Sequence, residues 1–482
     1  MSVARHTSYN IVGSLIPLAV NVVTVPLYLR QIGLERYGVL AICWVLVGYF
    51  GLFEMGLGPA TAQRIAPMEE EQAERRSATV WGALLLSLLL GMTGAAVLRI
   101  FAEPILTGIR GMRAGLAGEL TAALLWLAAL IPLGTTYGVL SGALQGRQQF
   151  LLLNLVSSAS NALMSIAPLA IAYAAGPQLT YLIPALVAAK AAAVAILFAV
   201  CWRAVPLAGP QWPSRQLLMS LASFGGWVTG AAILTPLLTS AEKFAIGWMV
   251  GAAAVSFYIV PFNLVSRVLL LPSSLASALF PRFAVMAEME RGEAERKALL
   301  WLVAVLGPAI VALIAVLQPF FRLWLGAGIA ARSAPIGTVL LAGLWFNCCS
   351  YVPHARLQGS GRPDLVTKIS LAQIVPYFVL LFEAIRLGGA MGAAIIWSVR
   401  AGVEMFVFFL VTGQPKQLIS IIRLPTALLL SAIALALVAP WPDPAGTSGL
   451  LLIFVIATLI GVHRLRLDLA AIARRFWQSP QV

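Results

Sequence analysis

Apolar runs about as long as a membrane-crossing helix recur from one end of this chain to the other, and they constrain the fold more than any other feature. The 482-residue chain is 60% hydrophobic and 10% charged, whereas soluble domains average roughly 45–50% and 25%. In a bilayer every backbone polar group must be satisfied inside the segment, which favours helices. The runs therefore predict an all-α, polytopic membrane protein with about 14 transmembrane helices.

The predicted helices lie near 8–29, 38–60, 79–101, 117–140, 150–174, 179–202, 217–241, 248–280, 298–320, 334–353, 365–386, 389–412, 422–440 and 447–463. No small-residue cleavage site follows the first run, so we expect a retained helix there and not a signal peptide. The four cysteines and three histidines show no metal-binding spacing, and we expect no metal or other cofactor.

The net charge of +14 is explained by the loops that flank the helices. With the N-terminus inside, 20 of the 32 lysines and arginines fall on the inner side and 9 on the outer side. Basic residues accumulate on the cytoplasmic side of membrane proteins. We therefore expect both termini in the cytoplasm, membrane lipid as the surroundings, and no nucleic-acid partner.

Segments of the first half recur in the second. "LQGRQQFLLLNLV" resembles "LQGSGRPDLVTKI", with Gln145 and Gln358 separated by 213 residues, and Gly33 matches Gly251 at a separation of 218. A duplicated six-helix unit in one orientation predicts two bundles around a central cavity, where transporters of this build bind substrate. The expected domains are an N-terminal bundle at 1–205, its repeat at 206–415, and two extra helices with a basic cytoplasmic tail at 416–482.

Three predicted helices carry polar stripes. Positions i, i+7, i+11 and i+18 share one helix face. The stripes are Ser256, Asn263, Arg267 and Ser274 in the eighth helix; Asn10, Pro17, Asn21 and Tyr28 in the first; and Asn154, Ser157 or Ser158, Asn161, Ser165 and Pro168 in the fifth. Such faces either hydrogen-bond between helices or line a water-filled cavity, and we favour the cavity.

Arg267 is the only charged residue between Lys243 and Arg282. Pro261 and Pro272 flank it, so we expect the helix to bend on both sides of it. A guanidinium cannot lose its proton, and its planar fork suits phosphate oxygens. Arg267 is therefore a candidate anion site, with an acidic partner on another helix, such as Glu54 or Glu404, as the alternative.

Further charges fall within or beside apolar runs. Lys190 has no acidic residue three or four positions away, so it either faces the cavity or extends toward an interface. Glu242 and Lys243 end the seventh helix, where we expect them to lie near water.

Arg400 and Glu404 are spaced to pair on one helix, as a structural or a functional pair. Glu54 lies near the inner end of the second helix, where it could meet Arg64 or a coupling cation. Arg400 is a candidate substrate contact, and Glu54 and Glu404 are candidates for ion coupling or gating.

Several motifs together resemble the polysaccharide exporters of the multidrug/oligosaccharidyl-lipid/polysaccharide superfamily. In the first half the matching positions are Pro26, Gly33, Tyr37, Gly38, Glu54, Gly56, Gly58, Ala60 and Arg64; in the second, Glu242, Lys243, Gly247, Gly251 and Tyr258. Glu54 stands where that family usually has aspartate. "SRVLLLPSS" also resembles the lipid II flippase branch, and that likeness places Arg267 in the central cavity.

The resemblance implies a V-shaped pair of six-helix bundles that moves a polyprenyl-diphosphate-linked oligosaccharide to the outer leaflet by alternating access. It implies a transport protein and not an enzyme, in the bacterial inner membrane, with a polysaccharide polymerase and assembly proteins as candidate partners. One alternative is a cation-coupled multidrug exporter, which should carry acidic cavity residues. Another is a membrane polymerase or ligase, which should have a larger outer loop than the one near 102–116.

Overall fold

The computed structural model of the protein describes residues 3–53, 56–107, 114–205, 209, 211–219, 221, 240–413 and 415–478, without the side chains of 3–16, 46–53, 70, 101–107, 114, 417 and 464–478. Contacts divide the chain into two compact units, Met1–Ser256 and Phe257–Val482.

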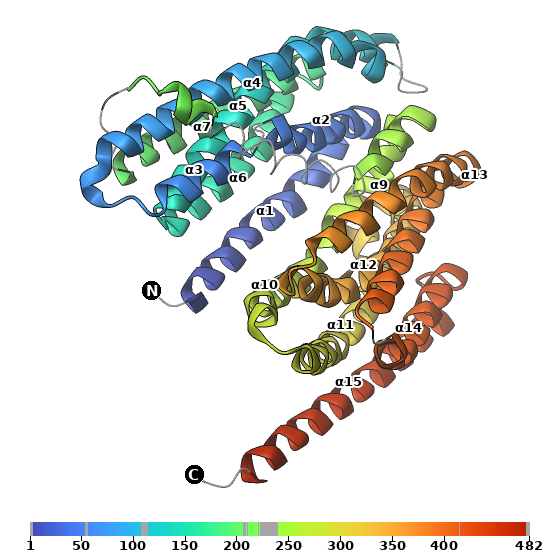
Figure 1. Cartoon of the computed structure of the whole chain (residues 1–482). Helices are drawn as coiled ribbons and strands as arrows, with labels where there is room; N and C mark the ends of the chain where they lie inside the picture. Colours follow the sequence, from blue (N-terminus) through green and yellow to red (C-terminus); the bar gives the residue numbers. More distant parts are fainter. Residues whose placement is uncertain are drawn as a thin grey trace. The chain divides into compact units, whose positions relative to one another are not determined.

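The first unit consists of helices packed side by side (Figure 1). They are α1 (Val3–Gln31), α2 (Gly33–Phe53), α3 (Leu57–Ile65), η1 (Glu70–Gln72), α4 (Ala73–Thr107), α5 (Ala114–Gly146), α6 (Phe150–Ala174) and α7 (Leu179–Ala204), with 240–249 also helical and α9 (Ala252–Val265) beginning in this unit. α5 packs against α4 and α7, and α6 packs against α1 and α7.

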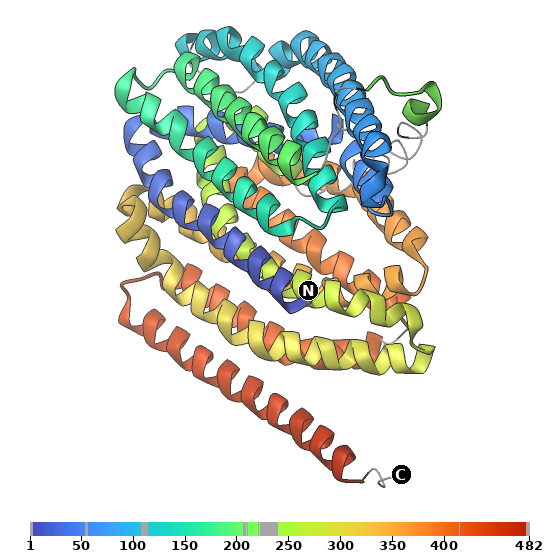
Figure 2. The ribbon, with the colours of Figure 1, turned by 90° about the vertical axis from the view of Figure 1, so that its left-hand side faces the viewer.

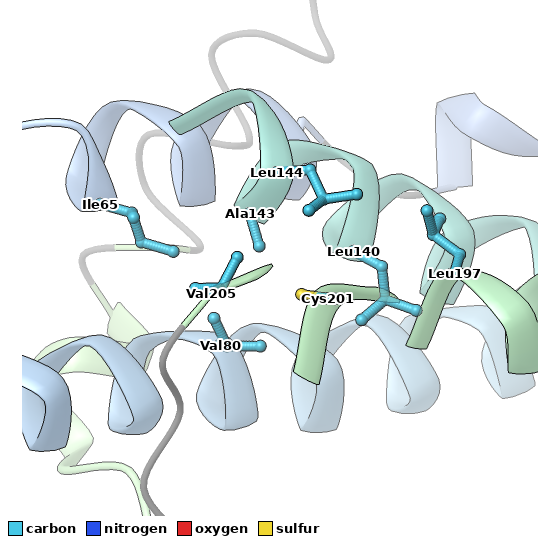
Figure 3. Close-up of a cluster of buried hydrophobic side chains, with 8 residues drawn as sticks. All are labelled: Ile65, Val80, Leu140, Ala143, Leu144, Leu197, Cys201 and Val205. Atoms are coloured by element: carbon cyan, nitrogen blue, oxygen red, sulfur yellow. The ribbon is translucent and has the colours of Figure 1, made fainter. Parts of the chain in front are cut away.

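A buried apolar cluster joins neighbouring ends of α3, α4, α5 and α7 (Figure 3). Its members are Ile65, Val80, Leu140, Ala143, Leu144, Leu197, Cys201 and Val205. Side chains from four helices interlock here, so the packing of branched and small residues fixes the relative positions of these helix ends. Tyr137 and Val194 pack on the edge of this cluster.

The second unit is built around α12 (Ala327–Gly359), which packs against α10 (Leu270–Val285), α11 (Glu288–Leu325) and α13 (Pro363–Val411). The remaining elements are η2 (Ser266–Leu269), α14 (Pro415–Val438) and α15 (Pro444–Gln478). α14 and α15 both pack on α11, and Figure 2 shows α15 in red along that side of the unit.

α13 is a helical hairpin and not one rod. Gly389 interrupts it with φ 57° and ψ −136°, a conformation in which side chains with a Cβ are strained. Beyond the turn, a Cβ on Gly392 would lie 1.8 Å from the Ala384 carbonyl oxygen, so the two arms meet closely at the turn. The predicted helices at 365–386 and 389–412 are therefore both present.

The suspected repeat has a counterpart in local backbone geometry. Gln148 and Gly361, at the spacing of 213, both have positive φ, 57° and 77°. The same hydrogen bonds surround them: Gln149 N donates to Leu144 O, and Arg362 N donates to Leu357 O, each at 2.9 Å. Gln148 is a non-glycine residue at positive φ, which is uncommon, and the matching position holds a glycine. The shared hydrogen-bond pattern at a spacing of 213 supports a shared origin for the two turns.

The all-α, polytopic fold class is confirmed. In the described part of the chain, ten helices are long and apolar enough to cross a membrane. The count of 14 stays a prediction, and most of the predicted helix at 217–241 lies outside the described residues. The predicted domain limits at 205 and 415 likewise stay predictions.

Gly142 allows α3 and α5 to cross in close contact, since a Cβ there would lie 2.1 Å from the Gly58 carbonyl oxygen. We predict that Gly142→Val separates these helices and lowers the thermal stability of the detergent-solubilised protein, because overpacking costs about 1–3 kcal/mol. Gly118→Val, on the same helix with nothing within 4 Å, is the control and should change it little. Equal melting temperatures for both variants would contradict this packing.

Candidate functional site

Arg267 lies in a single 3₁₀ turn that separates α9 from α10. The cause is Pro272, which has no N–H to donate to the carbonyl of Val268, and whose ring would clash with that carbonyl in an α-helix. The Leu270 N–H instead donates to the Arg267 carbonyl three residues back. The α-helix is thus interrupted at Arg267, whereas α9 continues as an α-helix through Pro261. The bends predicted on both sides of Arg267 stay predictions.

The Arg267 side chain is half-buried, and its Nε is buried with no hydrogen-bond partner. No carboxylate lies within ion-pair distance of it among the described residues, so neither Glu404 nor another described acid neutralises it there. Desolvating a guanidinium without a partner is costly. A ligand with oxyanions would remove that cost.

The other side chains of this polar stripe differ in exposure. Asn263 is exposed, and Ser274 is exposed with its hydroxyl donating to the Leu270 carbonyl at 2.8 Å. Ser256 is buried in the first unit, where its hydroxyl donates to the Leu34 carbonyl at 2.7 Å. Ser256 therefore joins helices, and Asn263 is the member available beside Arg267.

Lys190, at the middle of α7, is held by an aromatic ring. Its Nζ lies 3.8 Å from the centroid of the Tyr137 ring on α5, a cation–π contact. Tyr137 in turn shares a hydrogen bond of 3.0 Å with Ser157 on α6. Within the described residues Lys190 has no carboxylate partner.

Arg400 is paired, as its spacing predicts. Its Nη1 donates to Glu404 Oε2 at 3.1 Å, and its guanidinium lies 5.4 Å from the Tyr377 ring centroid on the other arm of the hairpin. Both charged side chains are largely buried. This pair is electrically neutral. Arg400 therefore attracts an anionic ligand less strongly than Lys190 or Arg267, which have no carboxylate partner in the described residues.

The polar stripe of the first helix, α1, includes a residue that joins helices. Tyr28 is buried and donates its hydroxyl to the Ser165 carbonyl of α6 at 2.7 Å, so it joins helices. Asn21 is half-buried. The side chain of Asn10 and the whole of Glu54 lie outside the described part, and their predicted roles stay predictions.

Glu242 and Lys243 differ from expectation. Both are buried, the carboxylate and the ammonium lie 3.7 Å apart, and the ammonium also contacts Ser240 Oγ at 3.0 Å. The expectation that they lie near water is wrong, because the two charges neutralise each other and helices cover them.

Two sets of ion pairs between helices were missed by sequence reasoning, one around Arg356 and one at Arg36. Arg356 donates to Glu295, which is fully buried, and to Glu288 at 2.5 Å, joining α11 to α12. Arg36 forms a two-point contact with Glu119 at 2.6 and 3.1 Å, joining α2 to α5. Both pairs span long sequence separations, so only the high acidic content of 288–295 hinted at one of them.

No group of three or more metal-ligating side chains is placed to hold a metal ion within the part that the structure describes. The four cysteines are buried, unpaired thiols. The charged side chains inside the helices are therefore the candidate ligand-binding groups.

These observations define a multi-pass helical membrane protein that retains unpaired cations within its spans. The chain belongs to the family described as polysaccharide biosynthesis protein, whose model matches residues 3–287. It is also 26% identical over 407 residues to a Shigella flexneri protein described as "Putative O-antigen transporter", an alignment covering 83% of this chain and 95% of that one.

Solved structures show the fold. The lipid II flippase MurJ in an inward closed conformation aligns with a TM-score of 0.66 at 13% identity, over 95% of this chain and 100% of that one. An inward-facing multidrug transporter of the MATE family and MOP superfamily aligns with a TM-score of 0.62 at 16% identity, over 88% and 99%. The likeness at these identities shows the fold alone, that of a polytopic helical membrane protein.

The Arg356 cluster yields a stability prediction. Arg356→Met leaves Glu295 buried without its partner, which typically costs about 3–5 kcal/mol, so the variant should melt at a clearly lower temperature. The double variant with Glu295→Gln should recover part of the loss. Lys368→Ala, which breaks an exposed pair with Asp364, is the control and should melt like the wild type. A single variant as stable as the control would contradict the cluster's structural role.

Proposed function

We propose that this protein is a flippase that moves a polyprenyl-diphosphate-linked oligosaccharide from the cytoplasmic to the outer leaflet. The observation that carries the proposal is the pair of cations, Lys190 and Arg267, that lie within membrane helices without a carboxylate partner in the described residues. An anionic head group on a lipid tail matches this arrangement, because the head group needs cations and the tail stays in the bilayer. Family membership and the O-antigen transporter relative support the same substrate class.

We also propose a membrane location for the protein and an arrangement of its helices in two bundles. The basic inner loops favour a bacterial inner-membrane protein with both termini in the cytoplasm. The repeated turns at Gln148 and Gly361 support two six-helix bundles at 1–205 and 206–415, with 416–482 appended. Alternating access would then expose the cations to each side in turn, with a polysaccharide polymerase and assembly proteins as downstream partners.

A cation-coupled multidrug exporter is the second candidate, because the MATE-family likeness shows the same fold. Such an exporter needs carboxylates free to bind cationic drugs. The described acids Glu404 and Glu295 are instead committed to Arg400 and Arg356. This pairing favours the flippase. The relatives are transporters by name, which also favours transport over a polymerase or ligase.

Reconstitution tests the proposal. Purified protein in proteoliposomes should move a fluorescent polyprenyl-diphosphate oligosaccharide between leaflets, measured by the fraction accessible to a membrane-impermeant quencher, at a rate well above protein-free vesicles. Proton-driven uptake of an organic cation, with no movement of the diphosphate lipid, would contradict the flippase and support the exporter.

Arg267 should be essential for this transport under the proposal. We predict that Arg267→Ala reduces flipping by about tenfold or more while the protein inserts and melts normally, because a hydrogen bond to a charged group contributes about 1.5–3 kcal/mol. Arg267→Lys should be partly active, since lysine keeps the charge and loses the planar fork. Arg322→Ala, at the end of α11, is the control. Wild-type flipping by Arg267→Ala would exclude this role.

A further inference from the structure

Three helices of the first unit each contribute one side chain to a polar cluster at membrane depth. These are Tyr137 of α5, Ser157 of α6 and Lys190 of α7. Tyr137 lies nine residues before the end of α5, which places it roughly 14 Å along the helix from that end at 1.5 Å per residue. A ligand that reaches this cluster must therefore be one that enters the membrane region.

Tyr137 is held in place from two sides. Its ring packs against the buried apolar cluster drawn in Figure 3, and its hydroxyl is bonded to Ser157 Oγ at 3.0 Å. A ring fixed in this way presents one face to Lys190, whose Nζ lies 3.8 Å from its centroid. The ammonium is thus positioned before any ligand arrives, which lowers the entropy that binding must overcome.

Lys190 is held differently from three buried cations of this protein. Arg400, Arg356 and Lys243 each contact a carboxylate, whereas Lys190 contacts a neutral ring. A cation–π contact stabilises the charge without cancelling it. The ammonium has three N–H donors, and in the described residues no hydrogen bond is assigned to them. Because Lys190 is only half-buried, those donors remain accessible.

We propose that Lys190, Tyr137 and Ser157 form an oxyanion-binding site in the first unit, in which Lys190 contacts the ligand and Tyr137 and Ser157 are positioning residues. The ligand chemistry is a phosphate or carboxylate oxygen of the transported glycolipid, so the inference rests on the proposed function. The oxyanion has two possible sources, the diphosphate of the lipid carrier and an acidic sugar of the glycan.

Transport kinetics in proteoliposomes test the site. Two substrates are compared, a polyprenyl-diphosphate oligosaccharide with neutral sugars and one that carries a uronic acid, and KM and Vmax are measured for each. Lys190→Gln should raise KM roughly tenfold, the size of one lost charge-assisted hydrogen bond. A rise for both substrates identifies the diphosphate as the ligand, and a rise for the acidic glycan alone identifies the sugar carboxylate.

Variants of Tyr137 test whether its ring positions Lys190 or only packs between helices. Tyr137→Leu removes the ring face and should raise KM nearly as much as Lys190→Gln, and the double variant should be no worse than either, because both changes remove one contact. Tyr137→Phe retains the ring and should have a smaller effect. Lys190→Arg should retain most of the affinity. Lys297→Gln, which breaks a half-buried pair with Glu293 in the second unit, is the control and should leave KM unchanged.

The outcomes separate the two proposals. Wild-type protein that flips both substrates, with KM unchanged in well-folded Lys190→Gln, would overturn the site and leave the flippase standing. Additive effects of Lys190→Gln and Tyr137→Leu would overturn the positioning role. Wild-type protein that moves neither substrate would overturn the proposed function and the site together.

Discussion

A bilayer interior cannot solvate a charge, and this constraint determines which partners the charged side chains of the protein need. A cation at the middle of a membrane helix costs about 2.5–3.5 kcal/mol on insertion scales, so each one needs a compensating group. Arg400 and Arg356 have carboxylates, and with their partners they join helices or helix arms. Lys190 has an aromatic ring, and Arg267 has no partner among the described residues. These two cations, which have no carboxylate partner among the described residues, are the basis for the proposed anionic cargo.

Local backbone geometry and side-chain packing position these two cations. Pro272 replaces an α-helical turn with a 3₁₀ turn at Arg267, and such turns bring side chains into orientations that a straight helix does not offer. In the first unit, the packed cluster under Tyr137 fixes the ring on which Lys190 rests. Neutral ion pairs and close glycine contacts hold the helices, and under the proposed function the unpaired cations bind the ligand.

Much of the fold could be predicted from sequence because membrane insertion depends on local hydrophobicity. Helix positions, the hairpin at Gly389 and the pairing of Arg400 with Glu404 all follow from neighbours within a turn or two. Tertiary partners could not be predicted in the same way. Tyr137 and Lys190 meet only because α5 and α7 pack together, and Arg356 meets Glu295 only through α11 and α12. The buried Glu242–Lys243 pair was misplaced for the same reason, since burial by neighbouring helices leaves no local pattern.

A binding titration measures whether the protein recognises the negative charge of a lipid head group, as we propose. Purified protein in nanodiscs would be titrated with polyprenyl diphosphate and, separately, with the uncharged polyprenyl alcohol of the same chain length. The account predicts that the diphosphate binds at least about a hundredfold more tightly, since two charge-assisted contacts contribute about 3–6 kcal/mol together. Its affinity should also fall as salt is added. Equal affinities for the two lipids would contradict the account.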